Sequence, residues 1–179
     1  MAKMLALSLK INDPNIRRAV VTDAPDDEFR GFYDICIPYE PAYGKGLNQK
    51  LHLDKYSPFD ETLFIDSDCL AVKSLGPAVA LCSEHLFAVF GDQVTSGEWY
   101  MDVAAMCKKF GCPSLPMFNG GTYYFKGSET ATKIYNQARK LKENYTENGF
   151  TGFRNSINEE PVIAVAMALN HVEAIDDRG

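Results

Sequence analysis

Two aspartates, Asp66 and Asp68, directly follow residues 62–65, an apolar segment typical of a strand. Ligands of an open α/β sheet bind outside the carboxyl ends of its strands, so these carboxylates are well placed for chemistry. Spaced i and i+2 on an extended segment, both side chains can lie on one face and bind one hard cation, Mn²⁺ or Mg²⁺. The same spacing also occurs where a strand ends in a polar turn, so the pair alone is a weak motif.

Three other segments carry polar residues that could join such a site. Lys50 lies four residues before Asp54 on an expected helix, where it could equally form an ordinary i,i+4 ion pair. Asn119-Gly120-Gly121 precedes an aromatic strand, and its glycines permit either a close backbone approach to a ligand or a simple turn. Glu159 lies in the first turn of the last expected helix, a position that the helix dipole favours for any acidic residue.

Composition limits the classes of partner. The chain has 179 residues, of which 46% are hydrophobic and 23% charged, as in a soluble globular domain. Its net charge of -6 repels phosphate backbones and anionic lipid, which argues against nucleic acid as a partner. An anionic substrate would therefore need a bound cation or a few well-placed basic side chains. No apolar run is long enough for a membrane span.

Cysteine usage favours a reducing compartment. The five cysteines contain no CxxC pair and are odd in number, so a disulfide framework is not expected. We therefore expect a cytoplasmic protein, and the oligomeric state stays open.

The pattern of apolar residues predicts helices alternating with strands. Expected helices cover residues 1–11, 45–56, 98–110, 128–147 and 159–170, with Gly111 ending the third and Ser128 capping the fourth. Expected strands cover residues 18–22, 34–38, 62–65, 86–90 and 122–125, the first two buried, and residues 112–116 are expected to be loop. This order predicts an α/β fold in one domain, residues 1–179, with a mostly parallel sheet flanked by helices.

Residues 56–72, YSPFDETLFIDSDCLAV, resemble the segment that carries the metal-binding DxD motif in nucleotide-sugar-dependent glycosyltransferases of the GT-A fold, especially the glycogenin-like and galactinol-synthase-like group. Residues 6–10 resemble that group's first helix and residues 20–23 its second strand. Residues 118–121 (FNGG) resemble its FNSG-type segment, and residues 158–161 (NEEP) its late acidic segment. These segments occur in the family's order over most of the chain, so the resemblance implies a GT-A-like, Rossmann-like fold.

The resemblance also implies roles for particular residues. Asp66 would contact the ribose and the cation, and Asp68 would be a metal ligand that bridges to the donor diphosphate. Lys50 would approach the donor near the diphosphate. The implied activity is transfer of a hexose from a UDP-sugar, with retention, to an unknown sugar, polyol or protein acceptor.

The remaining implied roles concern the transferred sugar. Asn119 would hydrogen-bond it, Gly120 would let backbone come close, and Glu159 would be the catalytic acidic residue beside it.

The sequence departs from the family at both ends. Family members begin with a strand and a loop that hold the nucleotide base, whereas this chain starts within the helix that follows. The family's later metal-binding histidine has no clear counterpart, because His171 lacks the expected Gly, Lys and Trp context. We therefore expect a core shortened at both ends.

Two alternatives to an active transferase stay open. The segment 63–68 also fits a haloacid-dehalogenase-like phosphatase, in which Asp66 would be the nucleophile and Asp68 an acid. The second alternative is a catalytically inactive, truncated module that binds a nucleotide sugar.

Overall fold

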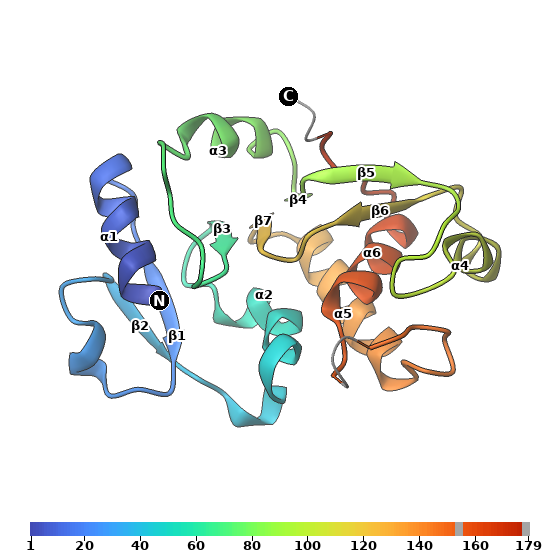
Figure 1. The fold of residues 1–179 in the computed structure, drawn as a ribbon, viewed down its shortest axis with the longest axis horizontal. Coiled ribbons are helices and arrows are strands. Elements are labelled where there is room, and N and C mark those ends of the chain that lie inside the picture. Colours follow the sequence, from blue (N-terminus) through green and yellow to red (C-terminus); the bar gives the residue numbers. More distant parts are fainter. Residues whose placement is uncertain (153–155, 177–179) are drawn as a thin grey trace.

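The computed structural model describes residues 1–152 and 156–176. Three small sheets lie across its described part, with helices packed against them (Figure 1). The strands are β1 (Ala19–Thr22), β2 (Ile35–Pro38), β3 (Glu61–Ile65), β4 (Phe87–Ala88), β5 (Gly91–Val94), β6 (Leu115–Phe118) and β7 (Thr122–Lys126). The α-helices are α1 (Ala2–Asn12), α2 (Leu53–Tyr56), α3 (Gly76–Cys82), α4 (Val103–Phe110), α5 (Glu129–Glu143) and α6 (Glu159–Leu169). Three 3₁₀ segments complete the set: η1 (Asp26–Phe29), η2 (Pro41–Tyr43) and η3 (Gly46–His52).

The α/β class is confirmed, but the expectation of a mostly parallel sheet is wrong. Only β1 and β2 pair in parallel among the described strands. Strand β7 pairs antiparallel with both β3 and β4, and β5 pairs antiparallel with β6. The physical reason is the path of the chain: β7 returns between β3 and β4 in the direction opposite to both, and α4 joins β5 to its antiparallel partner β6. An alternation of strands and helices along the chain therefore does not by itself fix strand direction.

The main core lies between α5, α6 and the β4 to β7 strands. Helix α6 is almost entirely apolar, and each of its residues from Pro161 to Met167 is buried. A helix that is apolar all round belongs inside a core, and α6 packs on α5 and β6. On α5 the buried residues include Ile134, Ala138 and Leu141, as the helical spacing predicts. This core holds one wall of the candidate site in place.

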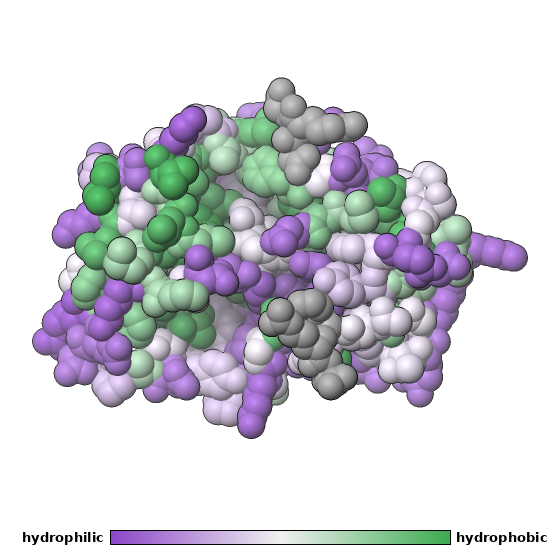
Figure 2. All heavy atoms as spheres, in the orientation of Figure 1, coloured by the Kyte–Doolittle hydropathy of each residue, from purple (hydrophilic) through white to green (hydrophobic). Residues whose placement is uncertain are grey.

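The N-terminal part is packed more loosely. Helix α1 buries Leu5 and Leu9, which form a small separate cluster with Ala71. Strands β1 and β2 were expected to be buried, but every residue of β1 is only half-buried. Figure 2 shows apolar side chains gathered on the surface over α1 and the chain between β3 and α3, and exposed residues there include Met4, Leu7, Leu70 and Val72.

Three segment predictions need correction. Residues 45–56 form the 3₁₀ segment η3 followed by the short α2, rather than one α-helix. Helix α4 begins only at Val103, because Asp102 caps it through a hydrogen bond that its side chain accepts from Ala105 N. Residues 115–118 form strand β6 instead of loop, with Pro116 opposite Gln93 on a two-stranded sheet where a missing N–H is tolerated.

The other expected elements agree more closely. Strand β7 and helix α6 lie where the pattern places them, and Gly111 ends α4 with a left-handed φ of 67°. Helix α5 starts after its Ser128 cap but ends at Glu143, one turn before the expected end. Strand β4 is shorter than expected and covers Phe87–Ala88 alone, and a separate strand, β5, begins at Gly91. Among the described residues, no helix has both the length and the apolar character needed to cross a membrane.

Candidate functional site

The ladder between β3 and β7 brings the aspartate segment beside the glycine segment. Ile65 lies opposite Thr122 in this ladder, and Asp66 N donates to Gly121 O at 2.9 Å. The end of β3 and the start of β7 are thus joined at one edge. Residues far apart in the sequence meet there.

Lys50 is the centre of the cluster. Its Nζ lies 2.9 Å from Asp66 Oδ2, 2.8 Å from the Gly120 carbonyl oxygen and 3.2 Å from Glu159 Oε1. Only 13% of the Lys50 side chain is exposed. Burial lowers the pKa of Lys50, but the carboxylates of Glu159 and Asp66 outweigh it, so the pKa is raised and the amine stays charged. A half-buried positive charge thus stands at the end of β3 in an acidic protein.

Glu159 is a buried carboxylate with incomplete hydrogen bonding. Its relative exposure is 1%, and Tyr123 OH donates to its Oε1 at 3.4 Å. Its Oε2 is buried and has no hydrogen-bond partner among the described residues. Burial raises the pKa of Glu159, and the Lys50 charge opposes that shift without cancelling it. An unpartnered buried oxygen of this kind normally has an explanation, such as a catalytic role or a bound water or ion.

The glycine segment forms a tight turn around this pair. The side chain of Asn119 accepts a hydrogen bond from Gly121 N at 2.9 Å, and Gly120 N donates to Glu160 Oε1 at 2.7 Å. A Cβ on Gly120 would lie 2.5 Å from Glu159 Oε1 and 2.8 Å from Tyr123 OH. Only glycine fits at position 120, because Glu159 approaches its backbone so closely. This contact could not be predicted from the sequence.

Asp66 and Asp68 belong to a turn rather than to an extended segment. Cys69 N donates to Asp66 O at 3.0 Å, which places Ser67 and Asp68 at the centre of a four-residue turn. The prediction that strand alternation brings both carboxylates to one face is therefore wrong. Asp66 faces Lys50, whereas Asp68 is exposed and takes part in none of the ion pairs found in the described part of the chain. That part gathers no group of three or more His, Cys, Asp or Glu side chains able to hold a metal ion.

The side chain of Lys50 does not pair with Asp54. Asp54 pairs with Arg139 and Lys55, and Lys50 points away from it toward Asp66 and Glu159. The i,i+4 alternative is therefore wrong. Of the residues singled out in the sequence, the structure joins Lys50, Asp66, Gly120 and Glu159 directly, with Asn119 in the adjoining turn and Asp68 two residues beyond Asp66.

A cavity of about 620 Å³ adjoins the cluster through Asn119 and Glu160. Its other lining residues come from β5 and the residue before it, from β6 and from the 98–100 loop: Phe90, Gly91, Asp92, Glu98, Trp99, Tyr100, Met117 and Phe118. Neither this cavity nor the contact of Glu160 with Gly120 was predicted from the sequence. One signal was available for Glu160, because Asn158 caps α6 by accepting from Glu160 N, which fixes the carboxylate at the helix start.

Comparison with known proteins gives a fold but no sequence family. No family model matches the chain, and no curated protein matches it by sequence. A solved structure of the galactosyltransferase LgtC in complex with donor and acceptor sugar analogues is similar, with a TM-score of 0.65 and 18% identity. A structure of an active-site mutant of LgtC is similar too, with a TM-score of 0.67 and 20% identity. Each match covers 99% of this chain and 69% of the LgtC chain.

The chain shares the fold of LgtC. This supports the GT-A-like fold implied by the resemblance, while the assignment to a glycogenin-like group stays a prediction.

Proposed function

We propose that this chain is a metal-dependent glycosyltransferase that moves a hexose from a UDP-sugar to an acceptor with retention of configuration. The observation that carries the proposal is the Lys50 cluster. It unites a buried amine, Asp66 and the incompletely bonded Glu159 at the end of a strand. The fold shared with LgtC is consistent with this activity.

The proposal places a divalent cation at the turn that carries Asp66 and Asp68. Asp66 and Asp68 would hold Mn²⁺ or Mg²⁺, hard ions that prefer carboxylate oxygen and keep coordination positions for phosphate. Bound there, the ion would supply positive charge to a departing nucleoside diphosphate. The exposed carboxylate of Asp68 suits this role, because it has no ion pair to break within the described structure.

Lys50 would add a second positive charge for the diphosphate. Asp66 and Glu159 both face this amine, so Lys50 alone does not reverse the local charge, and an anionic donor would also need the cation. Because the amine is held by Asp66, Glu159 and a backbone carbonyl, its position is fixed before any substrate binds.

Glu159 and Asn119 would orient the transferred sugar. The unpartnered Oε2 of Glu159 could accept a hydrogen bond from a sugar hydroxyl. As the bond to the diphosphate breaks, positive charge develops on the sugar ring, and a nearby carboxylate would stabilise it. Asn119 is exposed, and since its oxygen is used in the turn, its amide NH₂ is the group that would donate to the sugar.

Titration of the purified chain with UDP by calorimetry tests the donor site. We expect binding with Mn²⁺ present and loss of binding when EDTA removes the metal. Asp68→Ala should abolish the metal-dependent binding. Asp60→Ala, which removes another exposed aspartate just before β3, should leave it unchanged.

Equal UDP affinity in wild type and Asp68→Ala would refute the metal assignment. Turnover of p-nitrophenyl phosphate, with no reaction of nucleotide sugars, would favour the phosphatase alternative. Metal-dependent UDP binding with no hydrolysis or transfer of any UDP-hexose would favour the inactive module.

A further inference from the structure

We propose that the protein forms a symmetric dimer in which α1 packs antiparallel against α1 of a second copy. The feature that carries this inference is an apolar stripe on the solvent side of α1, formed by Met4, Leu7 and Ile11. The inference does not depend on the proposed function, because the stripe takes no part in the Lys50 cluster.

The stripe is exposed although its side chains are large and apolar. The exposed fractions are 57% for Met4, 41% for Leu7 and 79% for Ile11. Their i, i+3, i+7 spacing places the three side chains in one row along the helix. Leu5 and Leu9, on the opposite face of α1, are already buried in a cluster of the fold. The helix is thus apolar on two sides, and the described structure covers one of them.

One flank of the stripe continues it with further apolar side chains. Ser8 Oγ accepts from Ala71 N at 2.9 Å, and Asn12 Nδ2 donates to Ala71 O at 2.8 Å. The neighbours of Ala71, Leu70 and Val72, are 57% and 84% exposed. Figure 2 shows apolar side chains gathered over α1 and this segment. Single exposed apolar residues are ordinary, but a contiguous patch of this kind marks an interaction surface.

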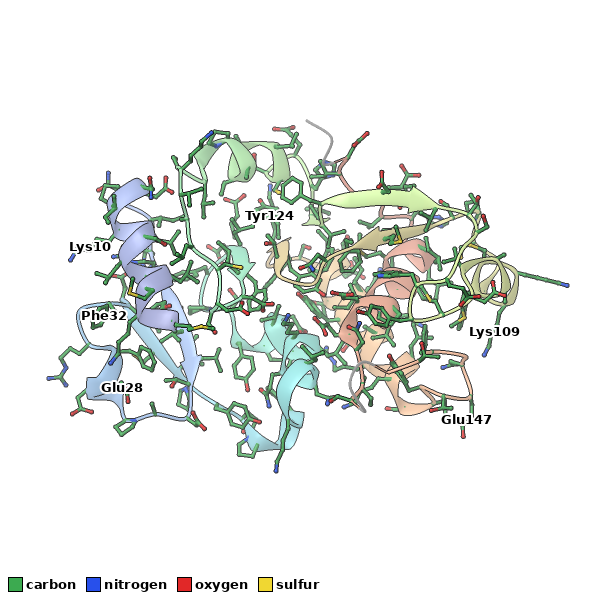
Figure 3. All side chains as sticks on the ribbon, viewed as in Figure 1. Lys10, Glu28, Phe32, Lys109, Tyr124 and Glu147 are labelled. Carbon is green, nitrogen blue, oxygen red and sulfur yellow. The ribbon has the colours of Figure 1, made fainter. Side chains whose placement is uncertain are left out.

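The other flank carries opposite charges at its two ends. Lys3 and Lys10 are about two turns apart and project from the same side of α1. Lys3 Nζ lies 3.2 Å from Glu28 Oε1, so Glu28 marks the N-terminal end of this flank. Lys10 marks the C-terminal end, is exposed, and forms no ion pair with the described residues. Figure 3 shows Lys10 and Glu28 on the same side of the molecule, displaced from each other along α1.

These features are self-complementary in an antiparallel pair. Leu7 lies near the middle of the stripe, so a two-fold axis there sets Leu7 on Leu7, and Met4 on Ile11 of the second copy. The axis brings each flank against the same flank of the second copy with its ends exchanged. Lys10 then approaches Glu28 of the second copy, and the reverse contact forms by symmetry. A parallel pair would instead oppose like charges, Lys10 to Lys10 and Glu28 to Glu28.

Sedimentation velocity over a wide range of protein concentrations tests the proposal. We expect a shift from a monomer of 19.9 kDa to a species of about twice that mass. Leu7→Glu places two like charges at the two-fold axis and should weaken the dimer about thirtyfold or more, as changes at the centre of an interface do. Leu86→Glu makes the same change at a residue of similar exposure, 48%, outside the stripe and should leave the dimer intact.

Circular dichroism of both variants shows whether α1 is kept, which we expect because glutamate is a good helix former. A monomer at every concentration would overturn the proposal, and so would a dimer that Leu7→Glu leaves unchanged. Equal weakening by Leu86→Glu would overturn it too. Pelleting of a monomeric chain with neutral phosphatidylcholine vesicles, abolished by Leu7→Glu, would assign the stripe to a membrane surface instead.

A charge reversal tests the antiparallel arrangement. Lys10→Glu sets a carboxylate against Glu28 at each end of the interface and should weaken the dimer about tenfold. Adding Glu28→Lys restores opposite charges and should recover most of the affinity. Lys109→Glu makes the same change on α4, at the far end of the molecule (Figure 3), and should have no effect. A double variant as weak as Lys10→Glu alone would overturn this arrangement.

Discussion

Lys50 and Asp54 lie about one turn apart in the η3 to α2 segment, and each forms a buried ion pair with a distant part of the chain. Asp54 receives two hydrogen bonds from Arg139, at 2.7 and 3.0 Å, in a parallel, two-pronged arrangement. Two further N–H groups of Arg139 donate to Leu51 O and Asn136 Oδ1. Both carboxylate oxygens of Asp54 are thus hydrogen-bonded.

The Lys50 pair is built differently. Its amine is shared between Asp66 and Glu159, and one oxygen of Glu159 has no partner among the described residues. Burial also raises the pKa of Glu159, whereas a fully compensated carboxylate next to lysine would have a lowered pKa. Both oxygens of Asp54 are therefore used within the fold, whereas one oxygen of Glu159 is left unused, and the proposed function assigns that oxygen to the substrate.

Removing the Arg139–Asp54 pair should have the largest effect on stability. Arg139→Ala leaves the buried Asp54 carboxylate with only the half-exposed Lys55 at 3.6 Å, so we expect the free energy of unfolding to fall by about 3 kcal/mol. Urea denaturation measures this change. Lys133→Ala on the same helix breaks an exposed i,i+4 pair with Glu129 and should cost roughly 0.5 kcal/mol or less. Similar losses in the two variants would contradict the comparison.

Crowding the Lys50–Glu159 pair should have an intermediate effect. In Gly120→Ala the new Cβ meets Glu159 Oε1 at 2.5 Å, so the carboxylate or the turn must move, at a cost of about 1–3 kcal/mol. UDP affinity should fall as well, because the Lys50 contacts share this turn. In the matched control Gly127→Ala the nearest atom lies at 3.6 Å, an ordinary contact. A stable Gly120→Ala protein with unchanged UDP affinity would show that the turn has no role in donor binding.

Neutralising Glu159 should affect stability least. In Glu159→Gln, Lys50 keeps Asp66 and the Gly120 carbonyl, so we expect a change of roughly 1 kcal/mol or less near neutral pH. Transfer of the sugar should nevertheless be lost, which an assay of UDP release from UDP-hexose measures. Retention of full transfer activity would remove Glu159 from the catalytic site.

The pH dependence of unfolding gives the sign of the Glu159 effect. Its pKa is raised above the ordinary value of 4.5 in the folded chain, so the native state binds the proton more readily than the unfolded state. Stability from this group therefore decreases as the pH rises from about 4.5 through the raised pKa. Urea titrations over this range should show a steeper decrease in wild type than in Glu159→Gln. Parallel curves would mean that Glu159 does not titrate with a raised pKa.

Local sequence patterns correctly predicted those helices and strands whose structure depends mainly on residues close by in the sequence. Strand β7, the Ser128 cap and helix α6 follow from aromatic runs, a capping residue and a continuous apolar stretch. The direction of strand pairing could not be predicted in the same way. It depends on contacts such as that between Ile65 and Thr122, whose partners are distant in the sequence.

In the candidate site, too, local features were predictable from the sequence and long-range contacts were not. Asp66 and Glu159 were recognised from their positions in motifs. Their meeting at Lys50 could not be predicted, because Lys50 lies 16 residues before Asp66 and 70 residues before Gly120, which it also contacts. The loop that carries Trp99 was not predicted, because the apolar residues of 98–102 have helical spacing. Only the Asp102 cap marks where α4 begins. Strand β6 was not predicted because it contains Pro116, and a proline is rare in a strand unless the strand lies at an edge.

The β3–β7 ladder has one further consequence, which concerns folding. Its register places Asp66 beside the turn that carries Asn119 and Gly120, and a slip by one residue would turn Phe64 and Tyr123 to the opposite face. The two halves of the site can meet only after this long-range ladder has closed in the correct register. Ability to bind the donor should therefore emerge late in refolding, at the same rate as β3–β7 pairing, so that ligand binding itself reports that the chain has reached its native arrangement.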